Sequence, residues 1–180
     1  QIGDRWRRIL PQFGASVALT VDRTDRSRGR LTVTGVVQDD GTPRITGAGE
    51  IADTAELAPT AAALALLASG PTRLTGIGHL RGHETDRLAA LTAEAARLGI
   101  TVDEDETSLG FPGTDASGPL SPAALETYHD HRMATFAAVV GLRVPGTGIV
   151  DVATTAKTMP DFPALWTALV APGDAAEEAR

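Results

Sequence analysis

Cysteine is absent from the sequence, which excludes a disulfide framework and thiol chemistry. A chain without cysteine suits a reducing cytosol, so we expect a cytoplasmic location. Long apolar runs are also missing: the longest, residues 61–68, is far shorter than the roughly 20 residues that cross a bilayer as a helix. The first residues do not resemble a signal peptide. The sequence therefore predicts neither a membrane span nor a secreted disulfide scaffold.

Positive charge is scarce as well. The 180 residues include 16 basic and 23 acidic side chains, which gives a net charge of −7. Nucleic-acid binding needs a broad basic face, so this balance predicts no nucleic-acid partner. An anionic ligand would have to be held by a local cluster of positive groups. With 42% apolar and 22% charged residues, the composition is that of one globular domain or two small ones.

Segments with helical and with strand patterns alternate along the chain. In residues 30–37, Leu31 and Val33 alternate with polar residues, which predicts a half-buried strand. We expect turns at 27–30 and 38–43, and a loop at 112–124, where Gly, Pro and Ser are frequent. Helices are predicted at 2–13, 57–69, 85–98, 131–142 and 161–170, and strands at 15–22, 30–37, 45–50, 72–77, 100–104, 107–111 and 147–152.

Two pairs of segments resemble each other and indicate an internal repeat. Residues 3–21 resemble 85–105, and residues 61–91 resemble 134–165, each with a helix, a turn containing Gly, and a strand. We therefore expect an α/β fold of repeated units, with helices on one side of mixed sheets. It is not a Rossmann fold, because no strand is followed by GxGxxG. Since the sequence lacks an initiator Met and opens on a helix, we expect it to be processed or a piece of a longer chain.

The rarest polar residues gather in three loops. The four histidines lie in two of them, His79 and His83 in GHLRGHETDR and His129 and His131 in YHDHR. The only lysine, Lys157, lies in the third, ATTAKT. Each loop leads into a helix N-terminus, where free N–H groups and the helix dipole favour an anion.

Arginines and carboxylates accompany these residues. Arg87 and Arg132 lie in the histidine loops, and arginine binds carboxylate or phosphate through a fork of N–H groups. Glu84 precedes Arg87, and Glu56 lies just ahead of the helix predicted at 57–69. Two carboxylates are available for proton transfer. Together these residues predict a pocket for a ligand with several negative charges.

Each of these residues also has a plain structural interpretation. Glu84 and Arg87 are three residues apart and could form a surface ion pair on a helix. Residues 129–131 could be a helix cap with exposed neighbours, and Glu56 could be a first-turn acid that favours the dipole. Zinc is a third option for the two histidines of YHDHR, but the site would need further ligands and no cysteine can supply them. We expect no metal.

Three motifs carry a resemblance to a known family. RGHETDRL (81–88), YHDHRMA (128–134) and TTAKTMPDF (154–162) resemble, in order and spacing, C-terminal segments of the 5-enolpyruvylshikimate-3-phosphate (EPSP) synthase family. The resemblance covers almost the whole chain. It implies repeated βαβαββ units with helices packed inside mixed sheets, an inverse α/β-barrel architecture. The UDP-N-acetylglucosamine enolpyruvyl transferases share this fold but not the ETDR and DHRMA pair.

The resemblance also implies an activity and roles for single residues. EPSP synthases transfer enolpyruvyl from phosphoenolpyruvate to the 5-hydroxyl of shikimate 3-phosphate, release phosphate and need no cofactor. Glu56 stands where an aspartate is commoner, and His83 where a lysine is commoner. The implied roles are catalysis by Glu56 and Glu84, shikimate 3-phosphate binding by Glu56, His79 and His83, phosphoenolpyruvate binding by Arg87, Arg132 and Lys157, and support by Asp130 and His131.

Family members are more than twice as long as this chain. We therefore expect residues 1–180 to be the C-terminal portion of one domain, with the first lobe and most of the second missing. On this interpretation the chain is inactive alone, needs the N-terminal part of the same protein, and is a monomer when full length. A non-catalytic anion-binding module, an enolpyruvyl transferase of the UDP-N-acetylglucosamine type and a structural protein are the alternatives.

Overall fold

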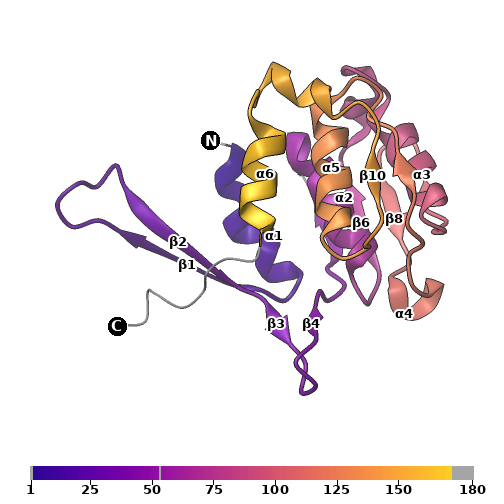
Figure 1. Cartoon of the computed structure of the whole chain (residues 1–180). Helices are drawn as coiled ribbons and strands as arrows, with labels where there is room; N and C mark the ends of the chain where they lie inside the picture. Colours follow the sequence, from indigo (N-terminus) through magenta and orange to yellow (C-terminus); the bar gives the residue numbers. More distant parts are fainter. Residues whose placement is uncertain (1, 53, 172–180) are drawn as a thin grey trace.

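The computed structural model describes residues 2–52 and 54–171 (Figure 1). Its helical elements are η1 (Ile2–Arg5), α1 (Trp6–Gln12), η2 (Ala55–Leu57), α2 (Ala58–Leu67), η3 (Gly78–Gly82), α3 (Arg87–Arg97), α4 (Thr114–Ser117), α5 (His131–Gly141), η4 (Val152–Lys157) and α6 (Phe162–Val170). Its strands are β1 (Ser16–Val21), β2 (Gly29–Thr34), β3 (Val36–Val37), β4 (Pro43–Arg44), β5 (Gly49–Ala52), β6 (Thr72–Thr75), β7 (Asp103–Glu104), β8 (Leu109–Phe111), β9 (Ala124–Leu125) and β10 (Gly148–Ile149).

One complete βαβαββ unit forms the centre of the fold. It runs β5–α2–β6–α3–β7–β8, and its sheet has the order β5-β6-β8-β7. β5 and β6 are parallel because α2 carries the chain back between them, whereas β8 is antiparallel to both β6 and β7. This unit is the one that the resemblance implied, and the predicted fold class is confirmed.

Two incomplete sets of elements flank this unit in sequence. Before it, α1 leads into the antiparallel hairpin β1–β2, as α3 leads into β7 and β8. After it, β9 and β10 pair in parallel across α5, as β5 and β6 pair across α2. The similarity of these sets explains why distant segments of the sequence resemble each other.

The strands of the central sheet place apolar and charged residues on opposite faces. Ile51, Leu74 and Leu109 lie across from one another in register and are buried. On the other face, Arg73 reaches over Gly110 and donates hydrogen bonds to Asp103 (2.7 Å) and Asp105 (2.6 Å). A Cβ atom at Gly110 would meet Arg73 Nη1 at 2.7 Å, so a larger residue there would displace the guanidinium from this position. The alternation turns one face of the sheet toward the core.

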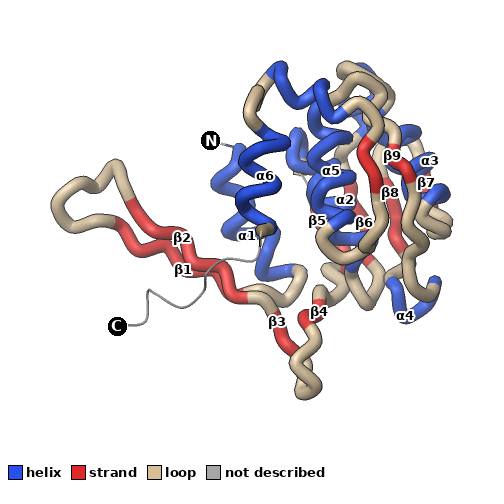
Figure 2. Tube along the Cα trace, viewed as in Figure 1, coloured by secondary structure: helices blue, strands red, loops and turns tan. Residues whose placement is uncertain are grey.

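Helices α2 and α5 pack against each other in the core (Figure 2). Helix α2 has buried residues all around it, and five of its alanines are fully buried. A helix that is apolar on every side belongs in the interior, and small alanine side chains allow its neighbours to approach closely. From α5, Met133 and Phe136 are fully buried against this core. The helices therefore fix the start of α5 firmly.

The hairpin β1–β2 differs from its prediction. Leu31 and Val33 are 47% and 46% exposed, so the alternating pattern of 30–37 does not mark a half-buried strand in this chain. Their cross-strand partners, Leu19 and Val17, lie on the same apolar face. Figure 1 shows the hairpin projecting away from the helices, and no described element covers this face. The pattern is that of a strand with a buried face, but the described residues do not include its cover.

Several element boundaries also differ from the prediction. The strand expected at 30–37 is divided at Gly35 into β2 and β3, and β2 already begins inside the turn expected at 27–30. Within 45–50 only Gly49 and Glu50 are in a strand. The short helices η3, α4 and η4 and the two-residue strand β9 were not predicted, because such short elements show no measurable periodicity. Among the described residues, no helix is both long and apolar enough to span a membrane.

Candidate functional site

The start of helix α3 is held by a network around Asp86. Asp86 caps the helix by accepting a hydrogen bond from the Ala89 N–H (3.1 Å). Arg81 donates to Asp86 (3.0 Å) and to Glu104 (2.8 Å), which ties the preceding loop to the sheet. Arg87 follows the cap as the first residue of the helix and is only 2% exposed. The loop therefore delivers Arg87 into the interior in a fixed orientation.

The start of helix α5 depends on a strained turn. Tyr128 and His129 both have positive φ, +54° and +56°, a conformation that costs non-glycine residues about 1–2 kcal/mol each. The turn places Asp130 at the N-cap, where its Oδ1 accepts from the Arg132 N–H (2.8 Å). The other oxygen, Oδ2, accepts from Arg87 Nε at 2.7 Å. Asp130 is fully buried, and it joins the starts of α3 and α5.

Two arginines from these helix starts converge on Glu56. Arg87 Nη1 donates to Glu56 Oε2 (2.8 Å), and Arg132 Nε lies 2.9 Å from the same oxygen. Arg132 Nη1 also donates to the Glu56 backbone carbonyl (2.9 Å). His83 Nδ1 lies 3.4 Å from Glu56 Oε1. The structure thus brings four predicted site residues together, with a carboxylate between two guanidinium groups. We name Arg87 and Arg132 the anion clamp.

The charges of this cluster set the pKa values of its carboxyl groups. Burial by itself raises the pKa of Glu56, but the Arg87 hydrogen bond and the charges of Arg87, Arg132 and His83 outweigh it, so the net shift is downward. Burial likewise raises the pKa of Asp130, but its bonds to Arg87 and to the Arg132 N–H lower it by more, so the net shift is again downward. Both carboxyl groups are therefore ionised at neutral pH.

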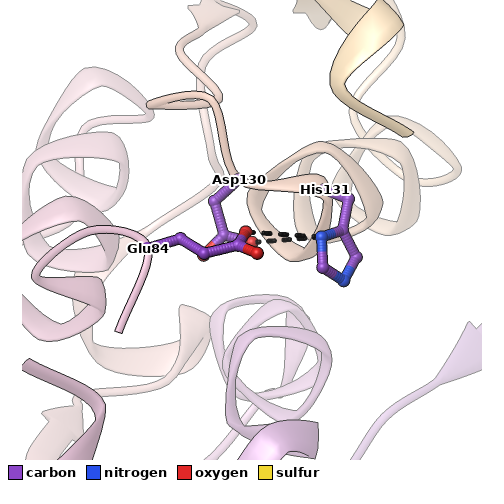
Figure 3. Close-up of side chains that lie close together, drawn as sticks. All are labelled: Glu84, Asp130 and His131. Carbon is purple, nitrogen blue, oxygen red and sulfur yellow. Dashed lines mark ion pairs between the residues drawn. The ribbon is translucent and has the colours of Figure 1, made fainter. Parts of the chain in front are cut away.

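A second group of predicted residues adjoins the first. The Lys157 ammonium, at the end of η4, pairs with Glu84 Oε1, although the two residues are 73 positions apart in the sequence. His131 Nδ1 lies 3.4 Å from Glu84 Oε2 and 3.9 Å from Asp130 Oδ1. Figure 3 shows both carboxylates directed at the same edge of the imidazole ring. Asp130 therefore links this second group to the anion clamp.

Glu84, Asp130 and His131 also offer three ligand atoms within 4.8 Å of one another, an arrangement that sequence reasoning did not predict. A cation could use such a set only by displacing existing partners. Lys157 already pairs with Glu84, and Arg87 with Asp130. A metal ion would lie among these positive charges, so the electrostatics disfavour it.

Two histidines, His79 and His129, lie outside the cluster around Glu56 and Glu84. His79 is exposed and reaches the cluster only through an edge-to-face contact with the His83 ring, whose centroid is 5.9 Å away. His129 has a side chain that is 93% exposed and lies 3.4 Å from Asp151. Its position is explained by the turn, which points residue 129 outward while it points Asp130 inward.

We expect the free energy of unfolding of the chain to fall as the pH drops below about 4.5. The pKa values of Glu56 and Asp130 lie below their ordinary values of 4.5 and 3.8, so the unfolded chain binds protons more readily than the folded chain. The stability that these groups contribute is complete above the ordinary values and is lost as the pH falls through the folded ones. Urea unfolding at a series of pH values measures the slope. In Asp130→Asn the free energy of unfolding should fall less steeply with pH between about pH 5 and 3, the range around these ordinary pKa values. An unchanged slope would contradict the lowered pKa of Asp130.

The fold and the cluster define an α/β protein in which the starts of two helices bring two arginines together on one carboxylate. The sequence matches the family described as EPSP synthase (3-phosphoshikimate 1-carboxyvinyltransferase) over residues 6–166. The chain therefore belongs to the EPSP synthase family.

Individual relatives agree with this membership. A 3-phosphoshikimate 1-carboxyvinyltransferase of Kocuria rhizophila is 50% identical over 170 residues, which cover 94% of this chain and 35% of the relative. One of Bifidobacterium longum is 45% identical over 165 residues, covering 89% and 34%. The chain thus spans about a third of the length of these curated relatives.

Solved structures show the same fold. EPSP synthase from Acinetobacter baumannii superposes with a TM-score of 0.69 at 26% identity, covering 88% of this chain and 37% of that one. The enolpyruvyl transferase NikO from Streptomyces tendae has a TM-score of 0.62 at 21% identity, covering 90% and 34%, and shows similarity of fold alone.

Proposed function

We propose that the chain is the C-terminal part of an EPSP synthase and supplies the phosphoenolpyruvate clamp and two proton-transfer carboxylates. The full-length protein would transfer enolpyruvyl from phosphoenolpyruvate to the 5-hydroxyl of shikimate 3-phosphate and release phosphate. The observation that carries this proposal is the convergence of Arg87 and Arg132 on one carboxylate, that of Glu56. A position that holds one carboxylate between two guanidinium groups suits the carboxylate or phosphate of phosphoenolpyruvate.

The exposure of Arg132 and Lys157 supports the proposal that a ligand binds at the clamp. Arg87 is buried and rigidly paired, whereas the Arg132 side chain is 32% exposed and the Lys157 side chain 63% exposed. A ligand can therefore approach Arg132 and Lys157 from solvent, while Arg87 holds the inner end of the clamp. The ligand would replace Glu56 as the anion between the two arginines.

This exchange gives Glu56 its role. While it is paired with both arginines, its pKa is held low and it is a weak base. When phosphoenolpyruvate takes its place, the lowering interactions are lost and the pKa rises. Glu56 can then accept the proton of the 5-hydroxyl as that oxygen attacks C2 of phosphoenolpyruvate. The longer Glu side chain, one methylene longer than Asp, allows both positions.

Glu84 serves the methylene carbon of phosphoenolpyruvate. In the addition step, the Lys157 ammonium passes a proton to Glu84, with which it is paired, and Glu84 delivers it to C3 while Glu56 takes the hydroxyl proton. In the elimination step, Glu84 takes one proton back from the C3 methyl group as the C2–O bond to phosphate breaks, and returns it to Lys157. The proton on Glu56 passes to the departing phosphate, so both carboxylates return to their starting state. His131 and Asp130 hold Glu84 and Arg87 in place.

The remaining expectations form part of the same proposal. Glu56, His79 and His83 contact shikimate 3-phosphate, and with histidine at position 83 this binding becomes pH-dependent. The rest of the site comes from the N-terminal part of the same polypeptide. The full-length protein is a cytoplasmic monomer that uses no metal or organic cofactor and binds neither nucleic acid nor membrane.

The clamp is tested by Arg132→Lys in the full-length protein. Lysine keeps the positive charge but loses the guanidinium fork, and one forked charged contact contributes on the order of 2 kcal/mol. The KM for phosphoenolpyruvate should rise about 30-fold, while the KM for shikimate 3-phosphate changes little. Arg26→Lys is the matched control, because Arg26 is exposed in the β1–β2 loop. An unchanged KM for phosphoenolpyruvate would reject the clamp.

A further inference from the structure

Glu94 is a fully buried carboxylate that the proposed reaction does not use. It lies on α3 seven residues after Arg87, which is two helical turns, so both side chains emerge from the same face of the helix. Burial of a carboxylate is unfavourable unless its oxygens accept hydrogen bonds or pair with a cation. The partners of Glu94 therefore indicate what the residue is for.

Among the described residues, the Glu94 carboxylate has three partners, and two of them belong to the segment that leads into α5. Tyr128 donates its hydroxyl proton to Glu94 Oε1 at 2.6 Å, and the Glu126 N–H donates to Oε2 at 2.9 Å. The third partner, Arg97 Nε, lies 3.3 Å from Oε1, but its side chain is half-exposed. The first two bonds, both partly buried, join α3 to residues 126–128. Glu94 thus holds this segment before and within the strained turn, and Arg87 holds it directly after the turn, at Asp130.

The turn between these two points needs such restraint. Tyr128 and His129 are not glycine, yet both are left-handed, and the Asp130 N–H donates to the Thr127 carbonyl (2.8 Å) to close the turn. Strained residues of this kind persist only where their surroundings over-determine them. Without the Glu94 bonds, residues 128 and 129 could relax, and the direction of Asp130 would change with them.

We propose that Glu94 is a positioning residue: by holding Tyr128 and Glu126 it maintains the left-handed turn that sets Asp130, and through Asp130 the anion clamp. The inference rests on the proposed function only in taking phosphoenolpyruvate as the anion that Arg87 and Arg132 bind. Burial, the hydrogen bond to Glu94 and the negative charge of Glu94 together raise the pKa of Tyr128 to about 12. This shift agrees with a close contact between Tyr128 and Glu94.

The contact is tested directly in the isolated chain, because Tyr128 is its only tyrosine. The tyrosinate absorbance band, followed during alkaline titration, reports Tyr128 alone. In the unsubstituted chain it should appear near pH 12, and in Glu94→Gln at least about one pH unit lower, because the negative charge is gone. Glu106→Gln, which removes an exposed carboxylate, should leave the titration unchanged. A tyrosine that titrates near its ordinary value of 10.0, or that ignores Glu94→Gln, would overturn the proposal.

The positioning role is tested in the full-length protein. Glu94→Gln should raise the KM for phosphoenolpyruvate about tenfold, and Tyr128→Phe, which removes the same bond from the other side, should do the same. Glu106→Gln is again the control. In an Arg132→Ala background Glu94→Gln should have a smaller further effect, since one of the two arginines that it positions is gone. Additive effects, or equal increases in the KM for both substrates, would show a general structural role and reject the proposal.

The two measurements separate this proposal from the proposed function. If the full-length protein turns over neither substrate, the proposed function fails. The titration of Tyr128 still decides whether Glu94 holds the turn, and binding of inorganic phosphate, followed by calorimetry in the same variants, replaces the KM as the readout of the clamp. Unchanged phosphate affinity in Glu94→Gln would then overturn the positioning role.

Discussion

Replacing Arg87 with alanine is expected to lower the free energy of unfolding of the chain by about 3–5 kcal/mol. Arg87 is 2% exposed, and its Nε donates to Asp130, which is fully buried. Alanine would remove the guanidinium and leave the Asp130 carboxylate in the core with only its bond to the Arg132 N–H. A buried charge without its partner is far more destabilising than the loss of a surface ion pair. Urea unfolding of the isolated chain measures the change.

Arg26→Ala is the matched control for this experiment, because Arg26 is exposed in the loop of the β1–β2 hairpin. Surface substitutions of this kind change stability by less than about 0.5 kcal/mol. The double variant Arg87→Ala/Asp130→Ala should recover part of the loss, because it removes both charges of the pair. An Arg87→Ala effect no larger than that of the control would contradict the buried pair.

Glu84→Gln is expected to lower the kcat of the full-length protein by about 10²–10⁴-fold, the usual contribution of a general acid–base group. Glutamine keeps the size of the side chain and can still accept hydrogen bonds, but it cannot carry a proton to and from C3 of phosphoenolpyruvate. The KM for phosphoenolpyruvate should change much less than the kcat, since Arg87 and Arg132 remain. Steady-state phosphate release at varied concentrations of both substrates separates the two parameters.

Exchange of solvent deuterium into the methylene group of phosphoenolpyruvate gives this prediction an independent check. A residue that protonates and deprotonates C3 must control that exchange, so Glu84→Gln should suppress it along with turnover. Glu106→Gln removes an exposed glutamate on the loop after β7 and should leave both rates unchanged. A Glu84→Gln protein that turns over at the normal rate would remove Glu84 from the mechanism.

The sequence predicted the central unit well because its elements are long or strongly patterned. Helices α2, α3 and α5 lie within one or two residues of their predicted bounds, and the buried run after Arg132 is in the core. The β1–β2 hairpin could not be predicted correctly from its pattern. Alternation indicates that a strand can bury one face, but whether it does depends on elements far away in sequence, and none among the described residues covers Leu19 or Leu31.

The sequence predicted which residues make up the site, but not how they pair with one another. Rare residues in loops before helices indicated Arg87, Arg132, Lys157 and Glu84, and the structure brings these together. The pairing of Glu56 with both arginines was not predicted, because it depends on how two helices approach a third. Glu94 was missed because a single glutamate on an amphipathic helix looks solvated. The one available clue was its spacing of seven residues from Arg87, which places it on the buried face.

Phosphate release from phosphoenolpyruvate and shikimate 3-phosphate tests the central claim most directly. We predict release by the full-length protein, none by the isolated chain, and restored release when the missing N-terminal part is supplied as a separate polypeptide. The complemented reaction should fail with the Arg132→Lys chain at concentrations of phosphoenolpyruvate that saturate the unsubstituted one. A full-length protein that binds both compounds but releases no phosphate would contradict the assignment of this chain to the catalytic part of an EPSP synthase.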